Sequence, residues 1–257
     1  MSSFIVRGVE IGGVYTKICV PVMPASLNEL EEVLCRLDTS VIDILEWRAD
    51  ALKGASHTDY LTGLALIRRT LGDGIAVLFT LRTAQEGGGF LGTADACAAA
   101  VAGIAASGAA DMIDIELCAG DENVHAVVKA ASGAGVRVVA SHHNFSGVYP
   151  PAEIADICKR MFSLGADIAK VALMPASINE CLSLMSTAET VRRKCEDGAI
   201  ILIGMGRYGL GSRILAQEIG SCITFAYGSS AGVSAPGQIS AQEMRQILDI
   251  AGRYAQF

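Results

Sequence analysis

Lys170 lies in an apolar segment where a charged side chain is unusual. The segment spans residues 165–175 and reads Gly-Ala-Asp-Ile-Ala-Lys-Val-Ala-Leu-Met-Pro, which predicts a buried strand. Removing an ammonium group from water is costly unless the charge is paired. A buried lysine is therefore often neutral, and a neutral amine attacks carbonyl groups. The alternative is a structural lysine whose stem packs in the strand while its amine reaches water.

Polar and charged residues also end most of the other apolar runs in the chain. Each could form a salt bridge, and for Asp114 and Glu116 a salt bridge is the preferred interpretation. Their shared place at run ends nevertheless indicates a common site. These residues are Glu46, Trp47, Arg48, Arg82, Glu86, Asp114, Glu116, His142, His143, Arg207 and Arg213, with Ser234 and Gln238 in the last long loop.

Two neighbouring histidines, His142 and His143, end the fifth apolar run. Adjacent side chains in a strand point to opposite faces, so only one of them can face an interior. This argues against a two-histidine metal site, and the other histidines lie in helical or loop segments. A single inward histidine one strand away from Lys170 indicates proton transfer beside an amine. We therefore predict no metal.

The elements that must position these residues alternate along the chain. Eight apolar runs predict strands, and most are continuous, as is typical of parallel strands buried on both faces. Helical patterns fill the gaps between them. The predicted strands span 17–22, 42–48, 75–81, 112–117, 137–142, 168–173, 199–205 and 221–226. The predicted helices span 26–38, 58–71, 93–107, 122–131, 151–164, 177–193, 212–219 and 240–254.

Eight strand–helix units predict an α/β fold, a single-domain (β/α)8 or TIM barrel over residues 1–257. Residues 4–7 and 9–11 predict a short N-terminal hairpin. The alternative is a doubly wound open sheet, but the turn after the first long strand lacks glycine. Residues 204–209 fit GxGxxG without the later acidic residue that a nucleotide site needs. They predict a loop that approaches a ligand, with a phosphate site as the competing interpretation.

Composition narrows the functional classes. The chain has 257 residues, 51% hydrophobic and 18% charged, with a net charge of −7. An acidic chain lacks the positive surface of a nucleic-acid-binding protein. No run of ~20 strongly apolar residues predicts a membrane span, and no signal peptide is visible. Eight cysteines without CxxC spacing predict reduced thiols in a cytoplasmic protein.

These motifs closely resemble the type I 3-dehydroquinate dehydratases. Similar spacing extends from Val6 over nearly the whole chain. The lysine segment and the loop 234–238 are the specific parts of the resemblance, whereas the Glu-x-Arg element alone is weak. The matching segments are Glu46-Trp-Arg-Ala-Asp50, Thr80-Leu-Arg82 with Glu86-Gly-Gly, His143, Asp167-Ile-Ala-Lys170 with Met174-Pro175, Gly211-Ser-Arg213 and Ser234-Ala-Pro-Gly-Gln238.

The resemblance implies dehydration of 3-dehydroquinate to 3-dehydroshikimate through a Schiff base, within the shikimate pathway and aromatic amino acid biosynthesis. It implies no cofactor and a homodimer. Lys170 would form the imine, His143 would transfer protons and Glu86 would orient His143. Burial and the arginines around Lys170 would favour its neutral form. The implied substrate contacts are Glu46, Trp47, Arg48, Arg82, Arg213, Ser234 and Gln238.

Two other functions stay open at this point. A class I aldolase-like barrel would form the same imine but break a carbon–carbon bond, and it would need a phosphate site. A non-catalytic barrel would only bind a small acid or a protein. Two residues depart from the family pattern. Asn144 stands where the family more often has Asp, and Pro21 stands where some members have serine. Neither change removes a group that the chemistry needs.

Overall fold

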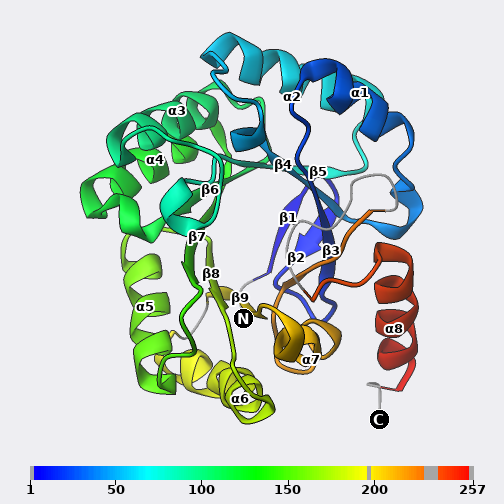
Figure 1. Cartoon of the computed structure of the whole chain (residues 1–257), viewed down its shortest axis with the longest axis vertical. Coiled ribbons are helices and arrows are strands. Elements are labelled where there is room, and N and C mark those ends of the chain that lie inside the picture. Colours follow the sequence, from blue (N-terminus) through cyan, green and yellow to red (C-terminus); the bar gives the residue numbers. More distant parts are fainter. Residues whose placement is uncertain (1–2, 196–197, 229–236, 255–257) are drawn as a thin grey trace.

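The computed structural model describes residues 3–195, 198–228 and 237–254. Its centre is an eight-stranded parallel barrel with helices around it (Figure 1), so the predicted (β/α)8 fold is confirmed. The strands are β3 (Lys17–Val22), β4 (Ile44–Arg48), β5 (Ala76–Thr80), β6 (Met112–Glu116), β7 (Arg137–Asn144), β8 (Ile168–Leu173), β9 (Ala199–Gly204) and β10 (Ile223–Phe225). The helices are α1 (Leu27–Cys35), α2 (His57–Leu71), α3 (Ala94–Ser107), α4 (Asp121–Ala134), α5 (Pro151–Ser163), α6 (Ile178–Lys194), α7 (Leu210–Ile214) and α8 (Ala241–Tyr254).

Sequential strands pair in parallel, in the order β10-β3-β4-β5-β6-β7-β8-β9. The last gap, between β9 and β10, is closed by one bridge in which Ile200 faces Ser221. The Cys222 amide donates to Ile200 O at 2.8 Å, and the Leu202 amide donates to Ser221 Oγ at 3.2 Å. The two residues just before β10, Ser221 and Cys222, therefore complete the closed barrel.

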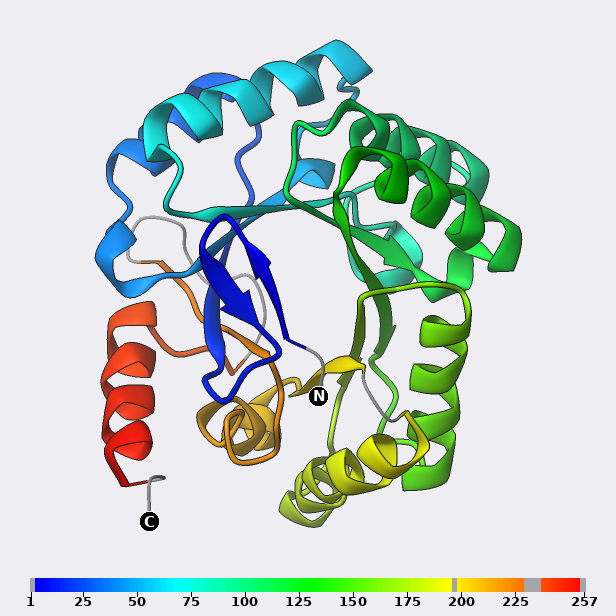
Figure 2. The same cartoon turned by 180° about the vertical axis from the view of Figure 1, so that it is seen from behind.

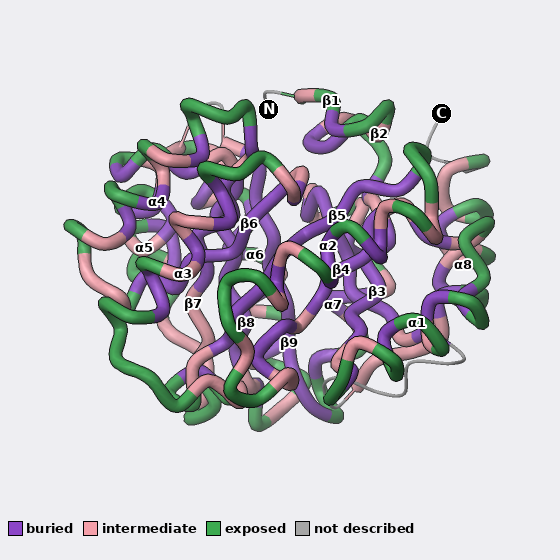
Figure 3. Tube along the Cα trace, turned by 90° about the horizontal axis from the view of Figure 1, so that it is seen from above, coloured by how far each residue is buried: buried purple, intermediate pink, exposed green. Residues whose placement is uncertain are grey.

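Alternation along the strands divides the buried residues into two layers. Side chains that point outward pack against the helices, whereas inward ones fill the barrel. Figure 3 shows that the central strands are mostly buried and that exposed residues lie on the segments around them. The interior is apolar toward the N-terminal strand ends, with Ile44, Met112, Val139 and Ile168 among its members. Two residues farther along β4, β6, β7 and β8, the inward residues are polar: Glu46, Asp114, Ser141 and Lys170. The polar groups therefore lie at the carboxyl-terminal side of the barrel interior, and apolar side chains fill the rest.

The predicted N-terminal hairpin is confirmed as β1 (Phe4–Val6) and β2 (Val9–Ile11). It lies across the end of the barrel where the parallel strands begin (Figure 2). Arg7 Nε donates to Asp111 Oδ1 at 2.7 Å just before β6, and the Arg137 guanidinium stacks on the Phe4 ring at 4.8 Å. The hairpin therefore covers the end of the barrel opposite to the polar layer.

Local capping explains several helix boundaries. Ser26 accepts a hydrogen bond from the Glu29 amide and begins α1, as its side chain predicts. The Glu29 carboxylate accepts from the Ala25 amide instead of the Ser26 amide, so only one of the two bonds of a capping box forms. Helix α7 is shorter than predicted and ends at Ile214, because the chain turns back to pair Ser221 with β9. No helix in the described ranges is both long enough and apolar enough to span a membrane.

Candidate active site

A cavity of about 230 Å³ opens at the carboxyl ends of the barrel strands. It brings together predicted site residues from three strands, β4, β7 and β8, and from segments that follow other strands. An open groove of about 790 Å³, between the start of β3 and α8, contains none of them. The cavity is lined by Glu46, Arg48, Arg82, Glu86, Gly87, His143, Phe145, Lys170, Ala172, Ile203, Met205, Arg213, Phe225 and Gln238.

Lys170 points into this cavity from the middle of β8 and is only 4% exposed. Its Nζ atom lies 3.5 Å from Asp114 Oδ2 and 3.8 Å from Glu46 Oε1. The amine also lies 4.4 Å from the centre of the Phe225 ring. Two carboxylates therefore lie near the Lys170 amine, in addition to the arginines that the sequence predicts around it. The buried position excludes the interpretation in which the amine reaches bulk water.

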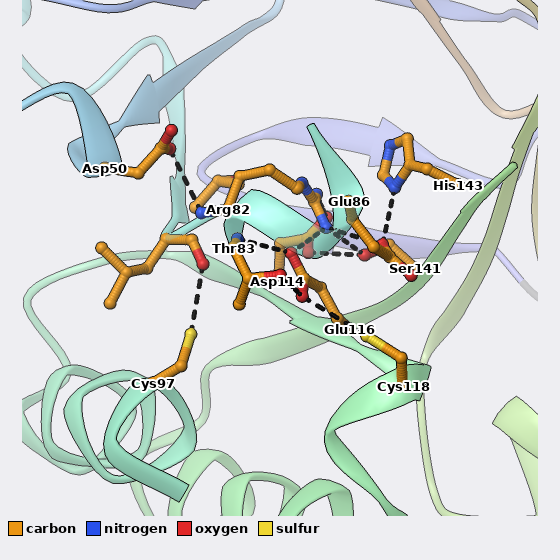
Figure 4. Close-up of polar contacts among 12 residues, drawn as sticks. Asp50, Arg82, Thr83, Glu86, Cys97, Asp114, Glu116, Cys118, Ser141 and His143 are labelled. Atoms are coloured by element: carbon orange, nitrogen blue, oxygen red, sulfur yellow. Dashed lines mark hydrogen bonds and ion pairs between the residues drawn. The ribbon is translucent and has the colours of Figure 1, made fainter. Parts of the chain in front are cut away.

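His143 and Glu86 both line the cavity and form a hydrogen-bonded pair (Figure 4). His143 Nδ1 lies 2.8 Å from Glu86 Oε2. Burial alone would raise the pKa of Glu86, but hydrogen bonds from His142 and His143 and the Arg82 charge hold it well below its usual range. The ionised carboxylate accepts, so Nδ1 carries the hydrogen and Nε2 keeps its lone pair. His143 Nε2 is therefore the basic nitrogen.

The surroundings keep His143 neutral. Burial lowers its pKa to about 4, and the Arg82 charge acts in the same direction against the opposing effect of Glu86. A neutral imidazole at neutral pH can accept a proton at once. His142, the adjacent residue, stacks on Tyr149 instead and does not line the cavity. The prediction that only one of the two histidines faces the interior is thus confirmed.

This low pKa gives a prediction for the pH profile. With neutral His143 as the base, kcat/KM falls as the pH drops through the His143 pKa, because protonation occupies the lone pair that accepts the substrate proton. We expect the acidic limb near pH 4 instead of near 6.5, where an ordinary histidine titrates. An NMR titration of His143 in the free protein checks the assignment. A His143 midpoint near 6.5 would contradict it.

Arg82 is the centre of a buried polar network (Figure 4). Its guanidinium reaches Asp114 at 2.8 Å, Glu116 at 3.1 Å and Glu86 at 3.3 Å. Burial alone would lower the pKa of Arg82, but these carboxylates raise it above its ordinary value. The salt-bridge interpretation of Asp114 and Glu116 is therefore confirmed. The same network fixes the positions of Glu86 and of the carboxylate beside Lys170.

Arg213 differs from Arg82 because it has no ion pair with any carboxylate in the described part of the chain. It is 2% exposed, and among the described residues its Nη1 donates to the Phe225 carbonyl at 3.2 Å. Its Nε has no hydrogen-bond partner. Burial lowers its pKa to about 10, so the group is still a cation at neutral pH. A buried, uncompensated guanidinium at a cavity wall is suited to bind a carboxylate.

Trp47 does not line the cavity, and its placement among the substrate contacts is wrong. Glu46 faces inward, so the next side chain faces outward, where the Trp47 ring packs edge-on against Tyr60 and Phe79. Ser234 falls outside the described residues, whereas Gln238 lines the cavity.

The structure adds residues that the sequence does not single out. Ser141 lies inward on β7, accepts from Arg82 Nη1 at 2.8 Å and donates to Asp114 Oδ1 at 2.7 Å. Its place two residues before His143 is a signal that strand alternation could have revealed. Thr80 similarly donates to Glu46 Oε1 at 2.8 Å. These hydroxyls hold the two carboxylates that face Lys170.

One group of side chains could geometrically approach a metal ion. Ligand atoms of Glu86, Glu116 and Cys118 lie within 4.8 Å of one another. Glu116 already accepts from Thr83 and Arg82, and Glu86 already holds His143. A metal here would take away the bonds that orient the imidazole. The geometry therefore favours a positioning role over metal binding: Glu116 holds Arg82 and Thr83, and Glu86 holds His143.

A family model described as type I 3-dehydroquinase matches residues 18–255. The chain belongs to that family. A 3-dehydroquinate dehydratase of Bacillus licheniformis is 36% identical over 249 residues, which cover 96% of this chain and 97% of that protein. The Bacillus subtilis 3-dehydroquinate dehydratase is 36% identical over 255 residues, 97% of each chain.

Solved structures of the type I 3-dehydroquinase family have the same fold. A type I 3-dehydroquinate dehydratase from Clostridium difficile, with covalently modified comenic acid, has a TM-score of 0.92 at 32% identity. The two chains overlap over 98% of each. The 3-dehydroquinate dehydratase of Geobacillus kaustophilus has a TM-score of 0.89 at 34% identity, covering 99% of this chain and 98% of that chain. The resemblance seen in the sequence motifs is therefore confirmed.

Proposed function

We propose that this chain dehydrates 3-dehydroquinate to 3-dehydroshikimate through an imine on Lys170, as a step of the shikimate pathway. One observation carries the proposal. A buried amine shares a cavity with the neutral base His143 and with Arg213, a cation that has no ion pair among the described residues. These groups match, in order, a ketone, an acidic proton and a carboxylate. Membership of the type I 3-dehydroquinase family supports the same substrate.

Imine formation begins with attack of the neutral Lys170 amine on the substrate ketone. The carbinolamine loses water, and the resulting iminium withdraws electrons from the adjacent carbon. Asp114 and Glu46, within 4 Å of Nζ, stabilise the cationic nitrogen as this charge develops. The proton on the α-carbon consequently becomes acidic enough for an imidazole to remove.

His143 then transfers the proton. Its Nε2 removes the α-proton to give an enamine, and Glu86 stabilises the imidazolium that forms. The enamine electrons expel the β-hydroxyl, to which His143 returns the proton as water departs. Hydrolysis of the conjugated imine releases the product and regenerates Lys170. The net change is the loss of one water molecule, and no cofactor is required.

Binding interactions hold the ring in place for these steps. Arg213 pairs with the carboxylate, while Glu46, Arg48, Arg82 and Gln238 contact the ring hydroxyls. Ile203 and Phe225 are among the apolar residues on the cavity wall. Such a wall excludes water and strengthens the electrostatic interactions inside. Ser234 and the homodimer remain predictions from the family resemblance.

Arg213→Ala is expected to weaken substrate binding more than it slows the chemical steps. We expect KM to rise about a hundredfold, equivalent to roughly 2.7 kcal/mol, because the carboxylate loses a buried cation. The matched control is Arg207→Ala, since Arg207 is exposed over Tyr208 outside the cavity. Steady-state kinetics of both variants test the role. An unchanged KM for Arg213→Ala would contradict it.

A substrate panel tests the activity against the aldolase alternative. The purified chain is incubated with 3-dehydroquinate and, separately, with phosphorylated ketose substrates of class I aldolases. We expect formation of the conjugated enone product from 3-dehydroquinate alone, followed by ultraviolet absorbance. Cleavage of a ketose phosphate without turnover of 3-dehydroquinate would overturn the proposed function.

A further inference from the structure

Asp50 lies in a short helical turn two residues after the end of β4 and joins three segments beside the cavity. Its Oδ1 accepts from Arg48 Nε at 2.8 Å and from the Arg82 amide at 3.1 Å. Its Oδ2 accepts from Arg48 Nη2 at 2.9 Å and from the Gly89 amide at 2.9 Å. The residue is 6% exposed. A carboxylate with this many donors is held in one orientation.

The first connection orients an arginine that lines the cavity. Asp50 binds Arg48 through Nε and Nη2, which is a two-point contact that fixes the plane of the guanidinium. Nη1 makes no hydrogen bond within the described ranges, and the side chain is only 14% exposed. Asp50 therefore holds Arg48 with one donor group left for a ligand.

The second connection fixes the segment that carries Glu86. Asp50 bonds the Arg82 and Gly89 amides, which lie on the two sides of Glu86 in the chain. From another side, Glu116 accepts from the Thr83 amide at 2.8 Å and from its hydroxyl at 2.6 Å. The placement of Glu86 beside His143 therefore depends on bonds that Asp50 makes to the backbone.

The glycines after Glu86 show how closely this segment approaches its supports. A Cβ atom added at Gly89 would lie 2.7 Å from the Asp50 carbonyl oxygen, and one at Gly88 would lie 2.1 Å from the Arg82 carbonyl oxygen. Both contacts are closer than real Cβ atoms approach backbone oxygens. Gly87 has φ +80°, which favours glycine. The run of three glycines thus allows the loop to close on Asp50.

We propose that Asp50 is a positioning residue that couples the substrate-binding Arg48 to the proton-transfer pair of Glu86 and His143. This inference rests on the proposed function and deepens it. The Asp50 carboxylate sets the orientation of the Arg48 guanidinium, and through the loop backbone it also sets the position of Glu86 beside His143. Loss of the carboxylate consequently disturbs binding and proton transfer together.

The first variant is Asp50→Asn, which keeps the shape but replaces an acceptor oxygen with an amide donor. In either orientation that donor would face Arg48, together with the Arg82 amide or the Gly89 amide. With 3-dehydroquinate as substrate, we expect KM to rise at least about tenfold and kcat to fall at least about tenfold. The imine trapped with borohydride persists, because Lys170 does not contact Asp50.

The second variant, Gly89→Ala, separates the two connections. The added methyl group pushes the loop away from Asp50 but leaves the Arg48–Asp50 pair in place. We expect kcat to fall about tenfold with KM changed less than about threefold. Gly74→Ala is the matched control, since a Cβ there meets nothing within 4 Å and the glycine is exposed. It retains wild-type kinetics.

An NMR titration of His143 gives a readout that does not need turnover. A loosened loop exposes the ring, so the His143 midpoint in Asp50→Asn and Gly89→Ala moves up toward the ordinary histidine value. An unchanged midpoint in both variants, or kcat and KM within twofold of the wild type, would overturn the positioning role. Absence of 3-dehydroquinate turnover in the wild type would instead overturn the proposed function, and the titration would still decide the role of Asp50.

Discussion

Lys170→Ala is expected to abolish turnover of 3-dehydroquinate. We expect kcat to fall by about four orders of magnitude or more, equivalent to more than about 5.4 kcal/mol, because no other group in the cavity forms the imine. The fold should persist, since Asp114 keeps its contacts with Arg82 and Ser141, and Glu46 keeps Thr80. Steady-state assays and circular dichroism measure the two effects.

Two further variants separate nucleophilicity from charge. Lys170→Arg retains a cation beside Asp114 and Glu46 but cannot form an imine, so it should be as inactive as the alanine variant. Lys53→Ala is the matched surface control, because Lys53 is exposed, and it should retain full activity. Substantial activity in Lys170→Arg would show that the positive charge, and not the covalent bond, is what the reaction uses.

His143→Ala is expected to stop the reaction after imine formation. Loss of a general acid–base group typically costs about 10²–10⁴-fold in rate, and we expect kcat to fall within that range. Imine formation should survive, because the amine and the carboxylates around it are unchanged. Rapid quenching with borohydride, followed by intact-mass measurement, detects the stalled adduct.

The adjacent histidine provides the control for this variant. His142 stacks on Tyr149 and lies 3.6 Å from Glu86 Oε1, so His142→Ala should lower kcat by less than about tenfold. Equal losses in His142→Ala and His143→Ala would contradict the assignment of Nε2 of His143 as the base. Near-normal turnover in His143→Ala would contradict it more strongly.

The barrel fold and the polar residues at its carboxyl-terminal end could be predicted from the sequence, because both depend on the pattern of residues within single segments. Continuous apolar runs indicate parallel strands, and polar residues at their ends indicate the catalytic face. Alternation within a strand also separates His143 from His142 correctly. The same rule places Trp47 opposite to Glu46, and applying it there would have excluded the tryptophan from the cavity.

Contacts between strands could not be predicted in the same way. Whether Asp114 lies beside Lys170, two strands away, depends on the stagger of the barrel, which no single segment specifies. The bonds from Asp50 to Gly89 depend on how a loop folds over its neighbour. Sequence pattern therefore indicates which residues face the cavity, and the three-dimensional structure indicates which of them touch.

Borohydride trapping tests the imine most directly. The wild-type chain is incubated with 3-dehydroquinate, reduced, and analysed by intact mass and peptide mapping. We expect one stable adduct per chain, located on Lys170 and absent from Lys170→Ala. Turnover without any trapped adduct, or an adduct located on another lysine, would contradict it.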